Sequence, residues 1–417
     1  MKIDTDYLII GASAAGVSAA IAIRERQPEA KIAIISKEPI AFYSRVLLPK
    51  FINGGIDKGK LILRDKNWFA EQNIELYLDE AAEKLDSNRH ALMTSRNNEF
   101  TYNKLLIATG VRPAKLPAPG SESESVFYLW NLADAEKLKA KMDEAGGGKI
   151  VVIGGGFICQ SFVNIFSRAN FDVNLLMRGK YYWSHFVDEY TGKLLNEEFE
   201  EEGVVLHQEE RVKEISKSGN GLIVQTEKGR EIQADIVLVG VGMIPNTAWL
   251  EGSGIELDDG VRVDEFMKTN LRDVYAAGDV VNFYDIILGG FHRQGNWVNA
   301  DRQGRIAGIN MAGGSEPYQE VTAFTIAVGK INFIFMGEYS RSRADKVVVR
   351  RDTDNQEVRE YLFKKDRLIG AILVNCPQDR ALIEKAIKDK IELSKNEKLS
   401  LAKAETPLDK TKIYGVN

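Results

Sequence analysis

The chain has 417 residues, of which 44% are hydrophobic and 28% charged, and its formal net charge is −5. That length allows two or three domains, and the charge balance gives no reason to expect nucleic acid or an anionic membrane as the main partner. No apolar run could span a bilayer, and the charged start Met-Lys-Ile-Asp is unlike a signal peptide. The two cysteines, Cys159 and Cys376, form no CxxC motif, so we expect no zinc or iron–sulfur site and a cytoplasmic location.

The first informative segment joins a buried strand to a helix through a glycine turn. Residues 5–10 are mostly apolar and lead into the turn, and residues 31–36 predict the next parallel strand. The turn and the start of the helix consist of Gly11, Ser13, Ala14, Ala15 and Gly16. Such a turn lets the backbone approach a pyrophosphate, and the helix N-terminus offers free N–H groups and the positive end of its dipole.

Two further features belong to this first half. Glu38 lies two residues beyond the second strand and is our candidate to bind an adenosine ribose. Residues from Lys104 onward predict another buried strand, which ends in the small residues Ala108, Thr109 and Gly110. A proline-rich stretch over residues 111–120 then predicts a crossover to another domain.

A second strand–turn–helix pattern begins at Lys149, where a run of apolar residues leads into three glycines. The residues expected to face a second pyrophosphate are Gly154, Gly156, Phe157 and Ile158. Two nucleotide turns in one chain suggest two dinucleotides, and two dinucleotides suggest electron transfer between them. Residues 235–246, which include Gly242, predict the return crossover.

The second site departs from the usual dinucleotide pattern. Cys159 stands at the third glycine, and no carboxylate ends the strand over residues 172–177. That carboxylate normally accepts both adenosine ribose hydroxyls of NAD, but here Met177 occupies the position and Arg178 follows. An arginine there could accommodate a 2′-phosphate, which favours NADP. The alternative is that nicotinamide-nucleotide binding is weakened and the domain is retained because it packs against the rest of the protein.

The third motif is a strand over residues 274–277, rich in small residues, followed by Gly278 and Asp279. The small residues allow a ligand to approach closely, and the carboxylate can accept hydrogen bonds from a polyol chain. Together the three motifs resemble the pyridine nucleotide–disulfide oxidoreductase superfamily over residues 1 to about 318. By that resemblance Asp279 holds the ribityl chain of FAD, and the segment ending at Gly110 lies near the flavin.

The resemblance implies an α/β fold with two Rossmann-like domains, one for FAD and one for NAD(P)H. We expect the FAD domain over 1–112 and 244–318 and the nicotinamide-type domain over 113–243. A C-terminal α/β domain with a charged helical tail would follow over 319–417, where short strands precede a charged helix.

The segment around Val46 indicates which branch of the superfamily this chain resembles. Disulfide reductases carry a redox cysteine here, and a valine cannot form a thiolate. The segment is more similar to the corresponding segment of rubredoxin reductases, ferredoxin reductases and the flavin module of nitrite reductases. By that resemblance, Arg45 of this chain would contact FAD. Lys50 would lie beside the reactive edge of the flavin and stabilise negative charge, unless it is an ordinary surface lysine. A glutamate that often pairs with that lysine is Ser161 here, and Trp297 would either cover the flavin or serve as a core aromatic.

These features predict an FAD-dependent NAD(P)H:acceptor oxidoreductase that uses no dithiol. A flavin accepts two electrons and releases them singly, and the chain has no iron centre of its own. The acceptor would therefore be a redox protein or a partner subunit, in a possible oligomer or complex. The alternative is an FAD electron-transfer subunit of a larger oxidoreductase, for example a tungsten or molybdenum enzyme.

Overall fold

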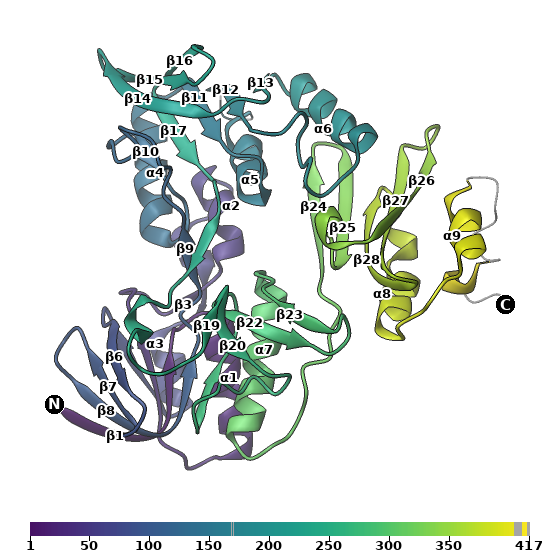
Figure 1. Cartoon of the computed structure of the whole chain (residues 1–417). Helices are drawn as coiled ribbons and strands as arrows, with labels where there is room; N and C mark the ends of the chain where they lie inside the picture. The colour runs from purple at the N-terminus through teal and green to yellow at the C-terminus, as the bar shows by residue number, and fades with distance from the viewer. Residues whose placement is uncertain (168, 170, 404–410, 415–417) are drawn as a thin grey trace. The chain divides into compact units, whose positions relative to one another are not determined.

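The computed structural model describes residues 1–167, 169, 171–403 and 411–414. The chain packs into two compact units (Figure 1). Unit 1 comprises Met1–Leu47, Ile56–Arg112 and Met243–Glu320. Unit 2 comprises Leu48–Gly55, Pro113–Gly242 and Val321–Asn417. Most of the predicted tail beyond residue 403 lies outside the described residues, and the three-domain division stays a prediction.

Unit 1 is built on a seven-stranded sheet in the order β5-β2-β1-β8-β7-β6, with β21 also pairing with β8. Five strands run parallel: β1 (Lys2–Ile10), β2 (Ile32–Ser36), β5 (Ile74–Leu78), β8 (Glu99–Ile107) and β21 (Val274–Ala276). The antiparallel strands β6 (Ala82–Asp86) and β7 (Ala91–Thr94) complete it. The predicted buried strands are confirmed, because β2 is buried at every residue and β1 and β8 at their carboxyl ends.

Two helices that belong to unit 1 pack tightly against each other, α1 (Ala14–Arg26) and α7 (Trp297–Met311). A Cβ added to Gly304 would lie only 2.1 Å from the carbonyl oxygen of Ala15, so the two backbones are in direct contact. This contact places the middle of α7 beside the first turn of α1.

Smaller elements complete unit 1. They are β3 (Phe42–Tyr43), β4 (Ile62–Arg64), α3 (Lys66–Glu71), β19 (Leu257–Asp258), β20 (Gly260–Val263), β22 (Val281–Asp285) and β23 (Gly290–His292). Strands β3 and β4 pair antiparallel, and the last four form a separate sheet. The two predicted crossovers pair with each other as β9 (Val111–Pro113) and β18 (Met243–Pro245).

Unit 2 contains a second parallel sheet in the order β10-β17-β11-β12-β13. Its strands are β10 (Val126–Phe127), β11 (Gly148–Ile153), β12 (Phe171–Leu176), β13 (Val205–His207) and β17 (Ile236–Val239). Its helices are α2 (Leu48–Ile52), α4 (Leu132–Ala145), α5 (Phe157–Phe166) and α6 (Glu189–Glu201). An antiparallel meander adds β14 (Val212–Ser218), β15 (Gly221–Thr226) and β16 (Glu231–Ala234).

The C-terminal part of unit 2 is a five-stranded antiparallel sheet in the order β24-β25-β28-β27-β26. Its strands are β24 (Ala323–Val328), β25 (Ile331–Gly337), β26 (Lys346–Asp352), β27 (Glu357–Lys364) and β28 (Arg367–Val374), followed by α8 (Arg380–Lys388) and α9 (Lys395–Ala402). It is tied to the parallel sheet's helices, because the Gln160 side chain donates to the Ala327 carbonyl at 2.6 Å. The backbone N–H of Asp188 likewise donates to Glu360 at 2.9 Å.

Candidate functional site

The first glycine turn lies directly against the end of β8. Gly11 has a φ of +118°, and a Cβ added there would lie 2.2 Å from the carbonyl oxygen of Ala108. Only glycine fits this conformation and this approach. The turn and the small residues after β8, which the sequence predicted to share a site, are therefore neighbours.

The Gly278–Asp279 pair reaches the same place from β21. Gly278 has a φ of +85°, and a Cβ added to it would lie 3.1 Å from the Cβ of Ala15 in the first turn of α1. Its N–H donates to the side-chain oxygen of Gln303 at 2.9 Å, a fully buried glutamine on α7. Gln303 therefore positions this turn, although no sequence pattern singled it out beyond its place on the helix near the motif.

Asp279 carries the clearest electrostatic signature of unit 1. Its Oδ1 atom is buried and has no hydrogen-bond partner among the described residues. Burial raises the pKa of this carboxyl to about 6, although the charges of Arg45 and Arg293 act to lower it. A buried carboxylate oxygen without a donor is costly, so this atom is suited to accept a hydroxyl hydrogen bond from a ligand.

These observations fit FAD. The backbone turn at Gly11 suits a pyrophosphate, and Asp279 offers a free acceptor for a polyol at the neighbouring turn. The approach of Gly278 to Ala15 shows that this arrangement brings together residues 263 positions apart in the chain. The individual roles assigned to site residues stay predictions.

Glu38 and Arg45, predicted separately, form an ion pair. The Tyr43 hydroxyl donates to the other Glu38 oxygen at 2.6 Å, and the Arg45 guanidinium lies 5.3 Å from the Tyr43 ring centroid. The carboxylate proposed for a ribose is thus held by two side chains of the following segment. Tyr43 was not predicted as a site residue, and its only sequence signal is its place two residues before Arg45.

Trp297, at the first position of α7, stacks on Phe42 of β3 with ring centroids 5.6 Å apart and planes 8° apart. It is partly buried and packs against the core of unit 1. The stack joins the segment that leads to Arg45 with the start of α7. It therefore supports a core role for Trp297 without testing the predicted contact with flavin.

Lys50 lies on α2, which is grouped with unit 2 and packs against α4 and α5. Its side chain is exposed and makes no hydrogen bond or ion pair within the described part of the chain. Val46, in the short helix Arg45–Leu47, is 64% exposed. The role of Lys50 at a flavin stays a prediction.

The second glycine turn has Cys159 at the position of its third glycine. Cys159 is buried, and its thiol donates to the carbonyl oxygens of Ile153 at 3.6 Å and Gly240 at 3.5 Å. Burial raises the pKa of this thiol to about 12, so it carries no thiolate at neutral pH. Cys159 therefore fills the space between the turn and β17 instead of supplying chemistry.

The end of β12 offers no carboxylate to a ribose. Met177 is 2% exposed, and Arg178 is exposed. The backbone N–H of Glu210 donates to the Met177 carbonyl at 3.0 Å, and the Oε1 atom of Glu210 pairs with Arg230. The Oε2 atom of Glu210 is buried and has no hydrogen-bond partner among the described residues. The glycine turn thus suits a pyrophosphate, and the choice between NAD and NADP at the adenosine end stays a prediction.

Phe157, the first residue of α5, belongs to an aromatic cluster. Its ring lies 5.0 Å from Trp183 and Phe186, 5.1 Å from Phe335 and 5.4 Å from Phe324. Phe324 and Phe335 come from the C-terminal sheet. That sheet is therefore packed on the turn of helix that opens the second nucleotide site.

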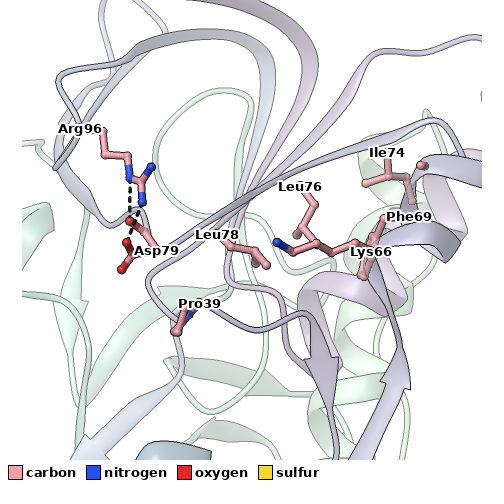
Figure 2. A pocket seen from close by; sticks show the side chains of 9 residues that line it. Pro39, Lys66, Phe69, Ile74, Leu76, Leu78, Asp79 and Arg96 are labelled. Carbon is pink, nitrogen blue, oxygen red and sulfur yellow. Dashed lines mark hydrogen bonds and ion pairs between the residues drawn. The ribbon is translucent and has the colours of Figure 1, made fainter. Parts of the chain in front are cut away.

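A cavity of about 500 Å³ lies elsewhere, between α3 and the edge strand β5. Figure 2 shows Lys66 extending from α3 towards Leu78, with the Arg96–Asp79 ion pair across the opening. One lining residue, Pro39, directly follows the predicted site residue Glu38 in the sequence. Among the described residues, no group of histidines, cysteines and carboxylates could hold a metal ion, and no helix is long and apolar enough to cross a membrane.

Comparisons with known proteins identify the family of this chain. The family profile described as "Pyridine nucleotide-disulphide oxidoreductase" matches residues 5–304. Rubredoxin-NAD(+) reductase of Pseudomonas putida is 28% identical over 91% of this chain and 98% of its own length. NADH-dependent phenylglyoxylate dehydrogenase subunit epsilon of Aromatoleum evansii is 28% identical over 89% of this chain and 88% of its own length.

Two further matches differ in extent. Nitrite reductase [NAD(P)H] of Bacillus subtilis is 25% identical over 94% of this chain, which spans only 48% of that protein. The ferredoxin reductase for the CYP199A2 system of Rhodopseudomonas palustris superposes with a TM-score of 0.87 and 25% identity, over 97% of this chain and 99% of that one. The chain belongs to the pyridine nucleotide-disulphide oxidoreductase family, whose members are FAD-dependent NAD(P)H oxidoreductases.

Proposed function

We propose that this protein is an FAD-dependent NAD(P)H:acceptor oxidoreductase that passes electrons to a redox protein or partner subunit without a dithiol. The observation that carries the proposal is the buried, unpartnered carboxylate oxygen of Asp279 beside the first glycine turn. Bound FAD supplies an acceptor for two electrons that can be released one at a time. The protein's own residues bind and orient it.

Each predicted site residue has a distinct task in this proposal. Asp279 accepts a hydroxyl hydrogen bond from the polyol chain, and the turn at Gly11 receives the pyrophosphate. Glu38 binds the adenosine ribose while Tyr43 and Arg45 fix its carboxylate. Lys50 supplies a positive charge that favours the reduced flavin.

The proposal excludes a thiol mechanism on the grounds of residue chemistry. Val46 stands where a redox cysteine would be needed, and Cys159 and Cys376 are both buried and free. Burial raises the pKa of each thiol to about 12, so neither forms a reactive thiolate at neutral pH. Two free thiols also fit a reducing cytoplasm, where we place the protein.

We assign the second site to NADPH in preference to NADH. Met177 cannot accept hydrogen bonds from two ribose hydroxyls, whereas the exposed guanidinium of Arg178 can receive a 2′-phosphate. The same absence of a carboxylate supports a second candidate function, an electron-relay subunit of a larger complex. One relative is named as subunit epsilon of an NADH-dependent phenylglyoxylate dehydrogenase, so a similar chain is a subunit of a larger enzyme.

Steady-state assays on the purified, FAD-loaded chain separate the two candidates. The reductase proposal expects NADPH to drive reduction of menadione, a neutral quinone, with a lower KM than NADH. The relay proposal expects neither nucleotide to support turnover, although chemically reduced protein still reduces the quinone. Failure of the refolded chain to bind FAD at all would refute both.

A further inference from the structure

The carbonyl of Gly156, the last of the three consecutive glycines in the second turn, accepts two hydrogen bonds. Gly156 is the N-cap of α5, and a glycine has no side chain that could cap the helix. Its carbonyl oxygen accepts the Gln160 N–H of the first helical turn at 3.3 Å. It also accepts the Tyr182 hydroxyl, at a shorter distance of 2.7 Å. A side chain from the loop after β12 therefore holds the glycine turn.

Tyr182 is itself fixed by helix α6. Its backbone N–H donates to the side-chain oxygen of Asn196 at 3.0 Å, and its ring meets Phe199 edge-on with centroids 4.8 Å apart. The side chain is fully buried, and burial raises the pKa of the phenol well above its usual value. The hydroxyl therefore stays protonated and donates its hydrogen to Gly156. Through Tyr182, α6 and the second glycine turn are joined.

The hydrogen bond from Tyr182 controls the direction of an N–H group that a bound pyrophosphate needs. The peptide between Gly156 and Phe157 is planar, so its carbonyl and its N–H point in opposite directions. The first N–H groups of a helix have no acceptor within that helix, which is why they suit a phosphate. Glycine backbones rotate more freely than others. A carbonyl held by Tyr182 thus keeps the Phe157 N–H in one orientation before any nucleotide binds.

We propose that Tyr182 is a positioning residue of the second nucleotide site, which pre-organises the Gly156–Phe157 peptide for a pyrophosphate. This inference rests on the proposed function and adds to it a residue outside the glycine motif. Because NADH and NADPH share the pyrophosphate, Tyr182 acts equally on both nucleotides. Arg178, which we assign to the 2′-phosphate, acts on NADPH alone.

The test compares the parent with Tyr182→Phe, in FAD-loaded protein. Phenylalanine keeps the ring beside Phe199 and removes only the hydroxyl. The matched control is Tyr361→Phe, because Tyr361 is a fully buried tyrosine on β27 of the same unit, with its hydroxyl 2.9 Å from that of Tyr414. Dissociation constants are measured for NADP⁺ and NAD⁺, which do not reduce the flavin. The third probe is adenosine 2′-monophosphate, which has no pyrophosphate.

We expect Tyr182→Phe to weaken NADP⁺ and NAD⁺ by the same factor, about 3- to 10-fold, because the peptide must then be ordered as the nucleotide binds. Affinity for adenosine 2′-monophosphate should be unchanged. In the menadione assay the KM for NADPH should rise by the same factor while kcat stays constant, since only binding is lost. Tyr361→Phe should match the parent in every measurement.

Three results would contradict the inference, and they are distinguishable. Parental affinity for both dinucleotides in Tyr182→Phe would overturn the positioning role. An equal loss of affinity for adenosine 2′-monophosphate would also overturn it, because the hydroxyl would then stabilise the whole domain and not the pyrophosphate turn. A parent protein that binds FAD but neither dinucleotide would refute the proposed reductase function, and this inference with it.

Discussion

Replacing Asp279 with asparagine tests the proposed flavin site through two opposite effects. The pKa of this carboxyl is about 6 in the folded protein, against about 3.9 in an unfolded chain. The folded state therefore binds more protons between pH 4 and 6, and it loses stability as the pH rises through that window. A difference of about two pKa units between the folded and unfolded states lowers the free energy of unfolding by roughly 3 kcal/mol at pH 7.

FAD-free Asp279→Asn should thus be more stable than the parent at pH 7, by up to roughly 3 kcal/mol, and equally stable below pH 4. FAD binding should respond in the opposite direction. A hydrogen bond to a charged group contributes about 1.5–3 kcal/mol and a neutral one about 0.5–1.5, so the variant should bind FAD about tenfold more weakly at pH 8. This penalty should shrink towards pH 5, because the parent carboxyl is then protonated.

Thermal denaturation of the FAD-free proteins from pH 4 to 8 measures the first effect, and fluorescence titration with FAD measures the second. Asp285→Asn is the matched control, since Asp285 is a buried carboxylate of the same unit that caps its own turn through the N–H groups of Ile287 and Leu288. It should leave FAD affinity unchanged. A destabilised Asp279→Asn protein at pH 7, or unaltered FAD affinity at pH 8, would refute the reasoning.

Three further predictions concern the redox chemistry and the nucleotide. Lys50→Met should lower the flavin reduction potential, because a cation that favours the reduced form is lost, and spectroelectrochemistry would show an unchanged potential if Lys50 is only a surface residue. The double change Cys159→Ser, Cys376→Ser should keep quinone turnover in the folded protein, and its loss would reopen a thiol mechanism. Arg178→Ala should weaken NADPH by about 10- to 100-fold and NADH little, whereas Met177→Glu should tighten NADH by a similar factor, both measured as dissociation constants.

Local sequence pattern was sufficient to predict the buried strands and the helices that follow a glycine turn. Residues 31–36 predict a buried strand because every side chain after Lys31 is apolar or small, and the structure has β2 over Ile32–Ser36 with every residue buried. The helix predicted to begin near Ala14 does so. The short strands of the C-terminal part also appear, but in an antiparallel sheet.

Contacts between distant segments could not be read in the same way. The packing of Phe324 and Phe335 on Phe157 joins positions more than 160 residues apart, and no local period encodes it. The hydrogen bond from the Tyr43 hydroxyl to Glu38 depends on the path of the chain after β2. The grouping of α2 with unit 2 likewise depends on its contacts with α4 and α5, so Lys50 could be assigned a role only by resemblance.

The central claim is that electrons pass from a nicotinamide nucleotide through bound FAD to a one-electron protein acceptor. Anaerobic stopped-flow spectroscopy of the FAD-loaded protein tests it most directly, with NADPH or NADH in one syringe and acidic rubredoxin present or absent in the other. The account predicts bleaching of the flavin absorbance by NADPH, more slowly by NADH, followed by reduction of rubredoxin. Bound FAD that neither nucleotide reduces would contradict the reductase account and leave the electron-relay subunit in its place.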